Sequence, residues 1–307
     1  GLDGAQINVE GTDLGHLGSE DPGFLRDVRA MADALGMFVE LDTCDTNPQN
    51  LTRVLNVCNA LGADRMRVYS SVGGDVKEEL KQAAEDLRQV VSLCADYDVR
   101  IAFENHEYEA SQDVLEVVRK VDSEYVGAHV DTGNSMMVWE DPIEAIKAMA
   151  SCAVSTHFKD HMVIKVNDQP MIAGVPLGKG SIDCAESFRI LAEQSPLDRI
   201  NIEVCYGYIA PFRLPEDKGF GAKLGHGCFR MHEPPYDPAV VAPHLLRSLA
   251  DGLEPQSYAW QDLAKIPRSE AQRQELLALQ DQAVVESVEY VKRLNHGRQG
   301  GPDQPRC

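Results

Sequence analysis

Four short apolar segments of the chain each carry, near their C-terminal end, a residue that can bind a metal ion. The segments are short and rich in β-branched residues, which is typical of buried strands. The C-terminal ends of parallel strands meet on one face of a barrel, so we expect these residues to converge. Three carboxylates and one imidazole suit a divalent cation such as Mn²⁺, Mg²⁺, Co²⁺ or Zn²⁺, of which Mn²⁺ is our first choice. The four residues are Glu104, Asp131, His157 and Glu203.

Three further polar residues follow these predicted ligands closely. His106 lies two residues after the first glutamate, so both side chains point to the same face of the strand. It could contact a substrate hydroxyl or support a carboxylate that binds the metal, and the sequence leaves both roles open. Asn134 could bind a hydroxyl or carbonyl group. Lys159 could polarise a carbonyl or hold a phosphate. We therefore predict that His106, Asn134 and Lys159 bind the substrate.

Two other residues lie close to the predicted ligands in the sequence. His129 shares the inward face of Asp131 but lies deeper in its strand, so we expect a core histidine. Asp160 should point away from the ligands and anchor a loop.

The elements that must position these residues alternate between strand and helix about every 30 residues. This period predicts a parallel sheet with right-handed crossovers. The fold class is therefore α/β, as a (β/α)8 TIM barrel. The expected strands are 4–9, 37–41 and 65–69, followed by the four ligand-bearing segments 101–106, 128–134, 154–160 and 200–204. The expected helices are 22–35, 48–61, 77–97, 111–120, 142–150 and 184–193.

Seven strands are visible, whereas a closed barrel of this type has eight. We therefore predict that a longer parent sequence supplies a strand and a helix upstream of Gly1. Two segments depart from the period. Residues 162–172 predict a hairpin that turns at 167–170, and residues 207–268, rich in Gly and Pro, predict an insertion that acts as a lid.

A last helix is expected over 269–294. We predict one TIM-barrel domain over residues 1–296 and a disordered tail over 297–307.

Composition narrows the class of protein. The 307 residues include 43% hydrophobic and 25% charged residues, with a formal net charge of −20. This charge argues against general nucleic-acid binding. The sequence contains no run of 18 or more apolar residues, so a membrane-spanning helix is not expected. The eight scattered cysteines favour reduced thiols in a cytoplasmic protein over a disulfide framework.

Taken together, the motifs resemble the xylose-isomerase-like superfamily of barrels, and within it the sugar phosphate isomerase/epimerase group that includes the ketose 3-epimerases. The resemblance covers about residues 1–206 and the last helix. It implies that Glu104, Asp131, His157 and Glu203 bind one divalent metal. The motifs that carry it are Glu104-Asn-His106, Val130-Asp-Thr-Gly-Asn134, His157-Phe-Lys-Asp160, Gly178-Lys-Gly-Ser-Ile-Asp183 and Ile202-Glu203.

The resemblance implies a sugar isomerase or epimerase that acts on a keto sugar through an enediolate, with Glu104 and Glu203 as catalytic acid and base. The runner-up is β-elimination by a lyase or dehydratase, similar to C-glycoside deglycosidases or keto-inositol dehydratases. A DNA-repair nuclease similar to endonuclease IV is a distant alternative, because Asn134 stands where that enzyme has a histidine ligand. A barrel that only binds a partner is the last alternative. The expected partner is a small-molecule sugar, and homo-oligomerisation stays open.

Overall fold

The computed structural model describes residues 2–9, 17–70, 74–242 and 269–299. Contacts divide the chain into two compact units, where the sequence predicts one domain with a lid. Unit 1 comprises residues 1–135, 144–157 and 191–201, and unit 2 comprises 136–143, 158–190 and 202–307. Of the helices in the described ranges, none is long and apolar enough to cross a membrane.

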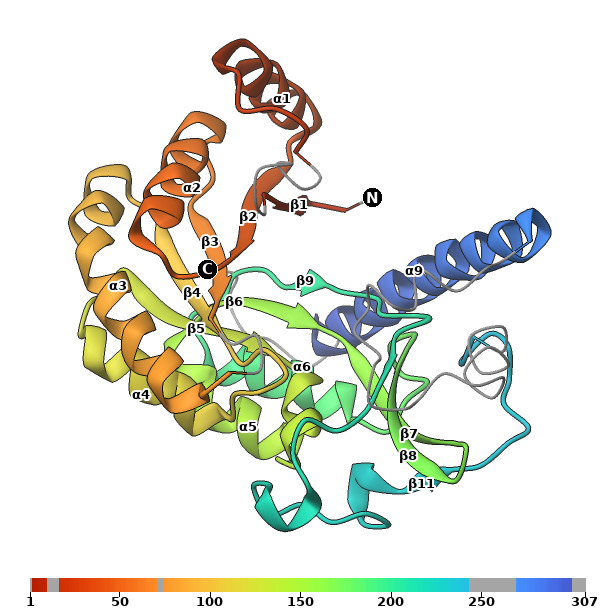
Figure 1. Cartoon of the computed structure of the whole chain (residues 1–307). Coiled ribbons are helices and arrows are strands. Elements are labelled where there is room, and N and C mark those ends of the chain that lie inside the picture. The colour runs from red at the N-terminus through yellow and green to blue at the C-terminus, as the bar shows by residue number, and fades with distance from the viewer. Residues whose placement is uncertain (1, 10–16, 71–73, 243–268, 300–307) are drawn as a thin grey trace. The chain divides into compact units, whose positions relative to one another are not determined.

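Unit 1 is built on a parallel sheet that nearly closes into a barrel, and this confirms the predicted fold class (Figure 1). The seven strands occur in the order β1-β2-β3-β4-β5-β6-β9, so each strand but the last pairs with its neighbour in sequence. They are β1 (Gly4–Asn8), β2 (Phe38–Cys44), β3 (Arg65–Tyr69), β4 (Arg100–Glu104), β5 (Val126–Asp131), β6 (Ala153–Phe158) and β9 (Asn201–Ile202).

Helices join the strands of unit 1 as crossover connections, and α1 to α4 lie along the outside of the strands in Figure 1. Their bounds agree with the expected ranges to within one residue. They are α1 (Pro22–Leu35), α2 (Pro48–Leu61), α3 (Val76–Tyr97), α4 (Ser111–Val121), α5 (Pro142–Met149) and α6 (Cys184–Gln194), the last two being shared with unit 2.

Local sequence signals set the ends of these helices. Asn47 caps α2 by accepting a hydrogen bond from the backbone N–H of Gln49, and Pro48 occupies the first helical position, where a missing N–H costs nothing. Gly36 ends α1 with a φ of 66°, a left-handed conformation that strains any residue with a Cβ atom. Because Gly36 ends α1, the next strand, β2, can begin two residues later, at Phe38.

The interior of unit 1 contains a buried polar cluster around Glu40 on β2. Its carboxylate accepts hydrogen bonds from Ser155 (2.6 Å) on β6, from Arg199 (2.7 Å) and from Asn201 (2.7 Å) on β9. Glu40 is fully buried, so these donors replace the water that the carboxylate loses. The cluster ties β2 to β6 and β9 across the barrel.

Unit 2 contains a second sheet with the strand order β10-β8-β7-β11. Strands β7 (Asp160–Val166) and β8 (Gln169–Val175) form the predicted hairpin, which is somewhat longer than expected. Asn167 and Asp168 make its turn, both with positive φ, which suits the right-handed twist of the flanking strands. The short strands β10 (Ile209–Ala210) and β11 (Met231–His232) complete the sheet.

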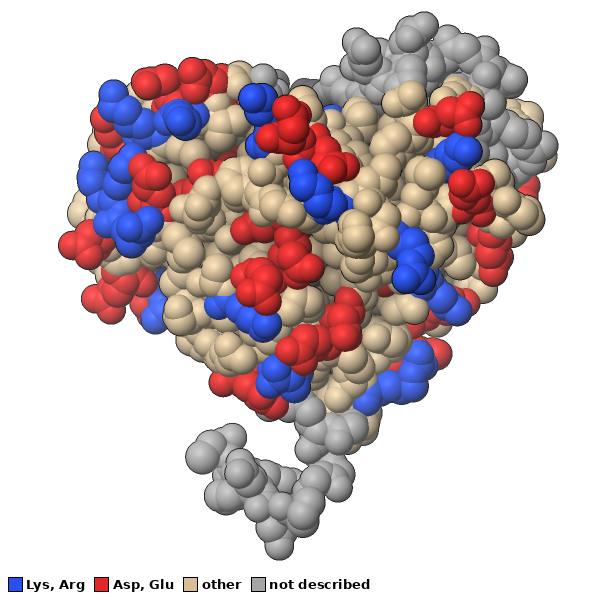
Figure 2. Space-filling view, turned by 90° about the horizontal axis from the view of Figure 1, so that it is seen from below, with Lys and Arg blue, Asp and Glu red and all other residues tan. Residues whose placement is uncertain are grey.

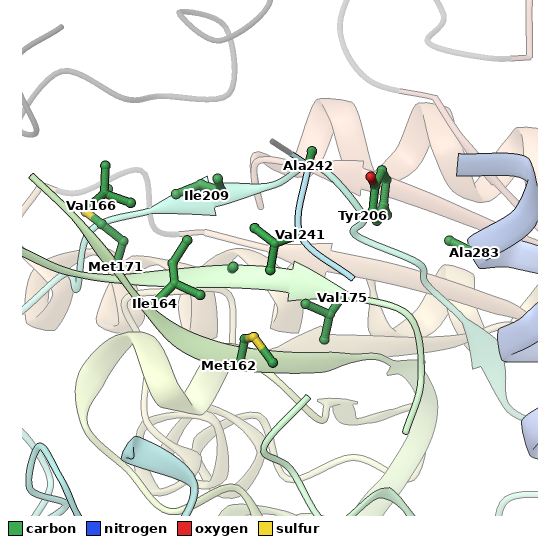
Figure 3. Packing of buried hydrophobic residues seen from close by; sticks show 11 residues of the cluster. Met162, Ile164, Val166, Met171, Val175, Tyr206, Ile209, Val241, Ala242 and Ala283 are labelled. Carbon is green, nitrogen blue, oxygen red and sulfur yellow. The ribbon is translucent and has the colours of Figure 1, made fainter. Parts of the chain in front are cut away.

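Apolar side chains lie on both faces of the hairpin, and alternate residues of β7 pack into two different hydrophobic cores. Met162 and Ile164 point to one core (Figure 3). This core also contains Tyr206, from the loop after β9, and Ala283, from α9 (Glu270–Gln299). Val163, between them, packs in the other core with Trp139 and Phe229, among others. A strand whose two faces are both buried reads as a continuous apolar run, and this explains the segment at 162–164.

The predicted lid is described as far as residue 242, and the rest of it, 243–268, lies outside the described residues. Within 207–242, the backbone of Arg213 and Phe220 donates to Met137 and Val138 respectively, so this loop is tied to the segment after β5. Helix α9 runs to Gln299, past the expected end at 294. Residues 300–307 of the predicted disordered tail lie outside the described residues.

Charged side chains of both signs are interspersed on the face shown in Figure 2. Ion pairs within single helices include Lys147 with Glu144 at 2.8 Å on α5 and Arg189 with Glu186 at 2.7 Å on α6. Such exposed pairs contribute little to stability.

Candidate functional site

Glu104 ends β4 as a fully buried carboxylate. Its Oε2 atom pairs with the guanidinium of Arg67 on β3. Its Oε1 atom lies 3.3 Å from Nδ1 of His157 and 3.7 Å from Nε2 of His129. Burial raises the pKa of Glu104, but Arg67 and the surrounding imidazoles outweigh it and hold the pKa well below its usual range. Glu104 is therefore an anion that faces two histidines.

Asp131 ends the next strand, β5, and is also fully buried. Its Oδ1 atom accepts hydrogen bonds from the backbone N–H groups of Gly133 (2.8 Å) and Asn134 (2.7 Å). Its Oδ2 atom lies 3.8 Å from Nδ1 of His157. One oxygen thus fixes the turn after the strand, while the other faces the same imidazole as Glu104.

His157 lies near the end of β6, and its two ring nitrogens contact different groups. Nε2 hydrogen-bonds Oε1 of Gln6 on β1, whereas Nδ1 faces both Glu104 and Asp131. A histidine that donates one N–H to an amide oxygen presents its other nitrogen as a metal ligand. The structure therefore brings together three of the four predicted ligands.

Glu203, the fourth predicted ligand, directly follows β9 and belongs to unit 2. Its backbone N–H donates to the carbonyl of Phe158, the last residue of β6, at 3.1 Å. Its carboxylate pairs with Nζ of Lys159 at 2.6 Å. Lys159 is buried, whereas 40% of the Glu203 side chain is exposed. The pair gives unit 2 an accessible carboxylate beside a buried cation.

His106 and Asn134 keep their predicted substrate-binding roles as proposals. The ring of His106 stacks on Tyr69 with 3.7 Å between ring centroids. Asn134 is buried in the turn after β5, where its N–H binds the carboxylate of Asp131.

Sequence reasoning missed Arg67, which lies between two acidic residues. Besides its pair with Glu104, it lies 3.4 Å from Oδ1 of Asp42, and its guanidinium contacts the Tyr69 ring at 4.4 Å from the centroid. Arg67 is buried, and arginine is almost never fully buried unless it is paired, as it is here. The sequence did contain a sign of this role, because Arg67 is a charged residue between the apolar residues Met66 and Val68 of a predicted strand.

Asp160 anchors a loop, as the sequence predicts. It accepts backbone hydrogen bonds from Gly178 (3.0 Å), Gly180 (2.8 Å) and Ile182 (3.2 Å). A Cβ atom at Gly180 would lie 2.2 Å from the Asp160 carboxylate, so the approach requires glycine. Burial raises the pKa of Asp160 to about 6, although the three N–H donors oppose this rise.

The donor atoms in unit 1 fit a divalent metal ion. Glu104, His129 and His157 are buried, and one ligand atom from each lies within 4.8 Å of the others. Buried carboxylates and imidazoles at this spacing are typical of metal sites with nitrogen and oxygen ligands.

The chain matches a known protein family. Residues 39–224, more than half of the chain, match the model of the xylose isomerase-like TIM barrel family, and the chain belongs to this family.

Two curated proteins are similar to part of the chain. The 3-oxo-isoapionate decarboxylase of Pectobacterium atrosepticum is 32% identical over 139 residues, which are 45% of this chain and 50% of that protein. The inosose dehydratase of Clostridium botulinum is 28% identical over 133 residues, which are 39% of this chain and 45% of that protein. The chain thus spans about half the length of these relatives.

Solved structures share the fold at low sequence identity. A D-tagatose 3-epimerase-like protein has a TM-score of 0.51 and 19% identity, covering 66% of this chain and 82% of that one. The IOLI protein, whose crystal structure contains a zinc atom, has a TM-score of 0.50 and 20% identity, covering 65% and 78%. These likenesses support the barrel fold.

Proposed function

We propose that this chain is a divalent-metal-dependent enzyme that converts a keto sugar or keto sugar derivative through an enediolate. The observation that carries the proposal is the buried group of Glu104, Asp131 and His157 at the ends of three consecutive strands. Ionisable groups are costly to bury unless they are paired or bind a metal. The named relatives include a decarboxylase of a 3-oxo compound, a dehydratase and a 3-epimerase-like protein. These reactions can share an enolate beside a carbonyl group.

Glu104, Asp131, His157 and Glu203 would hold the metal ion, which would polarise the substrate carbonyl and so acidify the neighbouring C–H bond. The remaining chemistry belongs to the protein. Glu203 accepts the proton from carbon, since 40% of its side chain is exposed and its carboxylate is paired with the ammonium group of Lys159 at 2.6 Å. Lys159 can then donate a hydrogen bond to the substrate oxygen that gains negative charge.

In an isomerase or epimerase, the enediolate must receive a proton at a new position or on the opposite face. Glu104 is the first candidate donor because it ends β4 of the sheet whose last strand, β9, directly precedes Glu203. It would have to carry a proton in one step and be ionised in the next. Water or a substrate hydroxyl would relay the proton from Glu203 to Glu104 and so regenerate the starting state.

A lyase is the second candidate, and the ion pair between Arg67 and Glu104 favours it. A carboxylate paired with a buried guanidinium is a good metal ligand but a poor proton donor. β-Elimination and decarboxylation need no proton from Glu104 on the opposite face. In elimination, Glu203 would take the proton, the β-C–O bond would break, and the hydroxyl would leave as water after protonation by Lys159.

The test is a panel of ketoses, aldoses, keto-inositols and 3-oxo sugar acids, incubated in D₂O with the Mn²⁺-loaded protein. Deuterium beside the carbonyl of an epimer or isomer supports the isomerase. A dehydrated product or released CO₂ supports the lyase. Absence of exchange and of product for every carbonyl compound would overturn the enediolate proposal.

A further inference from the structure

His129 lies at the centre of the buried cluster of unit 1, two residues before Asp131 on β5. It is fully buried and is the direct register partner of Glu104 on β4. Its ring meets that of His157 edge-on, with 4.3 Å between centroids. His129 therefore lies among the metal-binding residues and not in an apolar layer beneath them.

The pairing of β5 with β6 is irregular at this position. The register shifts between Ala128 and His129, so that His129 pairs with Ser155 while Asp131 pairs with His157. Such irregularities redirect side chains and are common beside active sites. Here the shift places the imidazoles of two neighbouring strands against one carboxylate oxygen.

The distances suit three ligands of one ion. Metal–nitrogen and metal–oxygen bonds of about 2.0–2.1 Å at tetrahedral angles place neighbouring donor atoms roughly 3.3–3.4 Å apart. Oε1 of Glu104 lies 3.3 Å from His157 Nδ1 and 3.7 Å from His129 Nε2. The ligand atoms of His129 and His157 lie within 4.8 Å of each other, so side-chain adjustment around one ion would bring all three atoms to bonding distance.

We propose that His129 is a direct metal ligand, so that Glu104, His129 and His157 form a tripod of two imidazoles and one carboxylate within unit 1. This tripod deepens the proposed function, because it rests on the same metal site, but it does not depend on which reaction the enzyme catalyses. Imidazole suits Zn²⁺, Co²⁺ and Fe²⁺, whereas carboxylate sets suit Mg²⁺ and Mn²⁺. The tripod thus shifts the expected metal from Mn²⁺ toward the imidazole-binding ions.

The first test counts imidazoles on wild-type protein loaded with one equivalent of Cu²⁺, by electron spin-echo envelope modulation. Two coordinated imidazoles are expected, and His129→Gln should leave one. A single imidazole in the wild-type protein would overturn the proposal, and this measurement requires no variant to fold. It also separates a ligand from a residue that only orients Glu104 through a hydrogen bond.

The second test measures Zn²⁺ and Mn²⁺ affinity by chelator competition. His129→Gln should weaken Zn²⁺ binding by roughly 100-fold or more, because even outer partners of metal ligands contribute about 10–100-fold. The loss should be larger for Zn²⁺ than for Mn²⁺. His161→Gln, which changes a buried histidine of unit 2, is the matched control and should retain wild-type affinity.

Unchanged Zn²⁺ affinity in folded His129→Gln, verified by circular dichroism, would contradict the tripod. The two proposals can fail separately. A two-imidazole site without deuterium exchange into any substrate refutes the enediolate function alone. Exchange together with a one-imidazole site refutes the tripod alone.

Discussion

The two units bury a carboxylate in opposite ways. In unit 1, Glu104 faces the Arg67 guanidinium and two imidazoles, and these groups hold its pKa well below the usual range. In unit 2, Asp160 faces three backbone N–H groups and no such cation is among the causes of its pKa shift, so burial raises its pKa to about 6. Backbone donors thus suffice to hold a carboxylate that anchors a loop, whereas the guanidinium of Arg67 favours the ionised form of Glu104.

The largest expected effect concerns the accessible carboxylate that we propose as the base. Glu203→Gln should lower kcat by about 10²–10⁴-fold, the usual contribution of a general base. The Tm should fall only modestly, because the side chain is 40% exposed and the amide oxygen of glutamine can still accept a hydrogen bond from buried Lys159. Initial rates with the substrate identified by the panel, together with thermal melts, measure both quantities.

Glu216→Gln provides the matched control for this change. Glu216 is a glutamate of unit 2 with 39% exposure, paired with Lys223 at 3.5 Å. Its replacement should leave both rate and Tm near the wild-type values. A fully active Glu203→Gln variant would refute the assigned role.

The second prediction breaks the charged cluster of unit 1. Arg67→Met removes the buried partner of Glu104 and should lower the free energy of unfolding by about 3–5 kcal/mol, because it leaves an uncompensated buried charge. Saturating Zn²⁺ should reduce this deficit, since a bound cation supplies positive charge. Urea unfolding with and without Zn²⁺ measures both effects.

Arg29→Met serves as the control, because Arg29 forms a partly exposed ion pair with Asp33 on the surface of α1. This change should cost at most about 1 kcal/mol. If Arg67→Met lowered the free energy of unfolding by no more than the control does, the buried charge of Glu104 would not need Arg67 for its stabilisation.

The third prediction uses the raised pKa of Asp160. Its folded-state pKa of about 6 exceeds the ordinary value of 3.8, so the folded protein binds this proton more tightly than the unfolded chain. The stabilisation is complete below about pH 4 and is lost as the pH rises through 6. The loss amounts to about 3 kcal/mol, at 1.36 kcal/mol for each pKa unit.

Asp160→Asn isolates this contribution from the other titrating groups. The difference in unfolding free energy between wild type and variant should change with pH mainly between 4 and 6. The variant should also be less stable overall, because its NH₂ group would face a backbone N–H donor. A difference that is independent of pH would contradict the raised pKa.

These contrasts also show what the sequence could reveal. Apolar periodicity and capping residues predicted the strands, helices and hairpin, because local patterns determine these elements. The predicted ligands Glu104 and His157 were singled out because each lies at or near the end of its own strand. Arg67 and His129 were harder to assign, since their roles depend on which atoms other strands bring to them. Pairing across the barrel, including the register shift at His129, is not encoded in a local pattern.

The smallest expected effect is local and should depend on neither charged cluster. Gly36 ends α1 with a φ of 66° and has open space where a Cβ atom would lie. Gly36→Ala should therefore cost about 1–2 kcal/mol through backbone strain alone, and the cost should be the same at pH 4 and pH 7, with or without Zn²⁺. Gly36→Asn should cost less, because asparagine tolerates the left-handed conformation better. Urea unfolding of both variants measures the difference, and equal costs would mean that backbone conformation is not what requires glycine here.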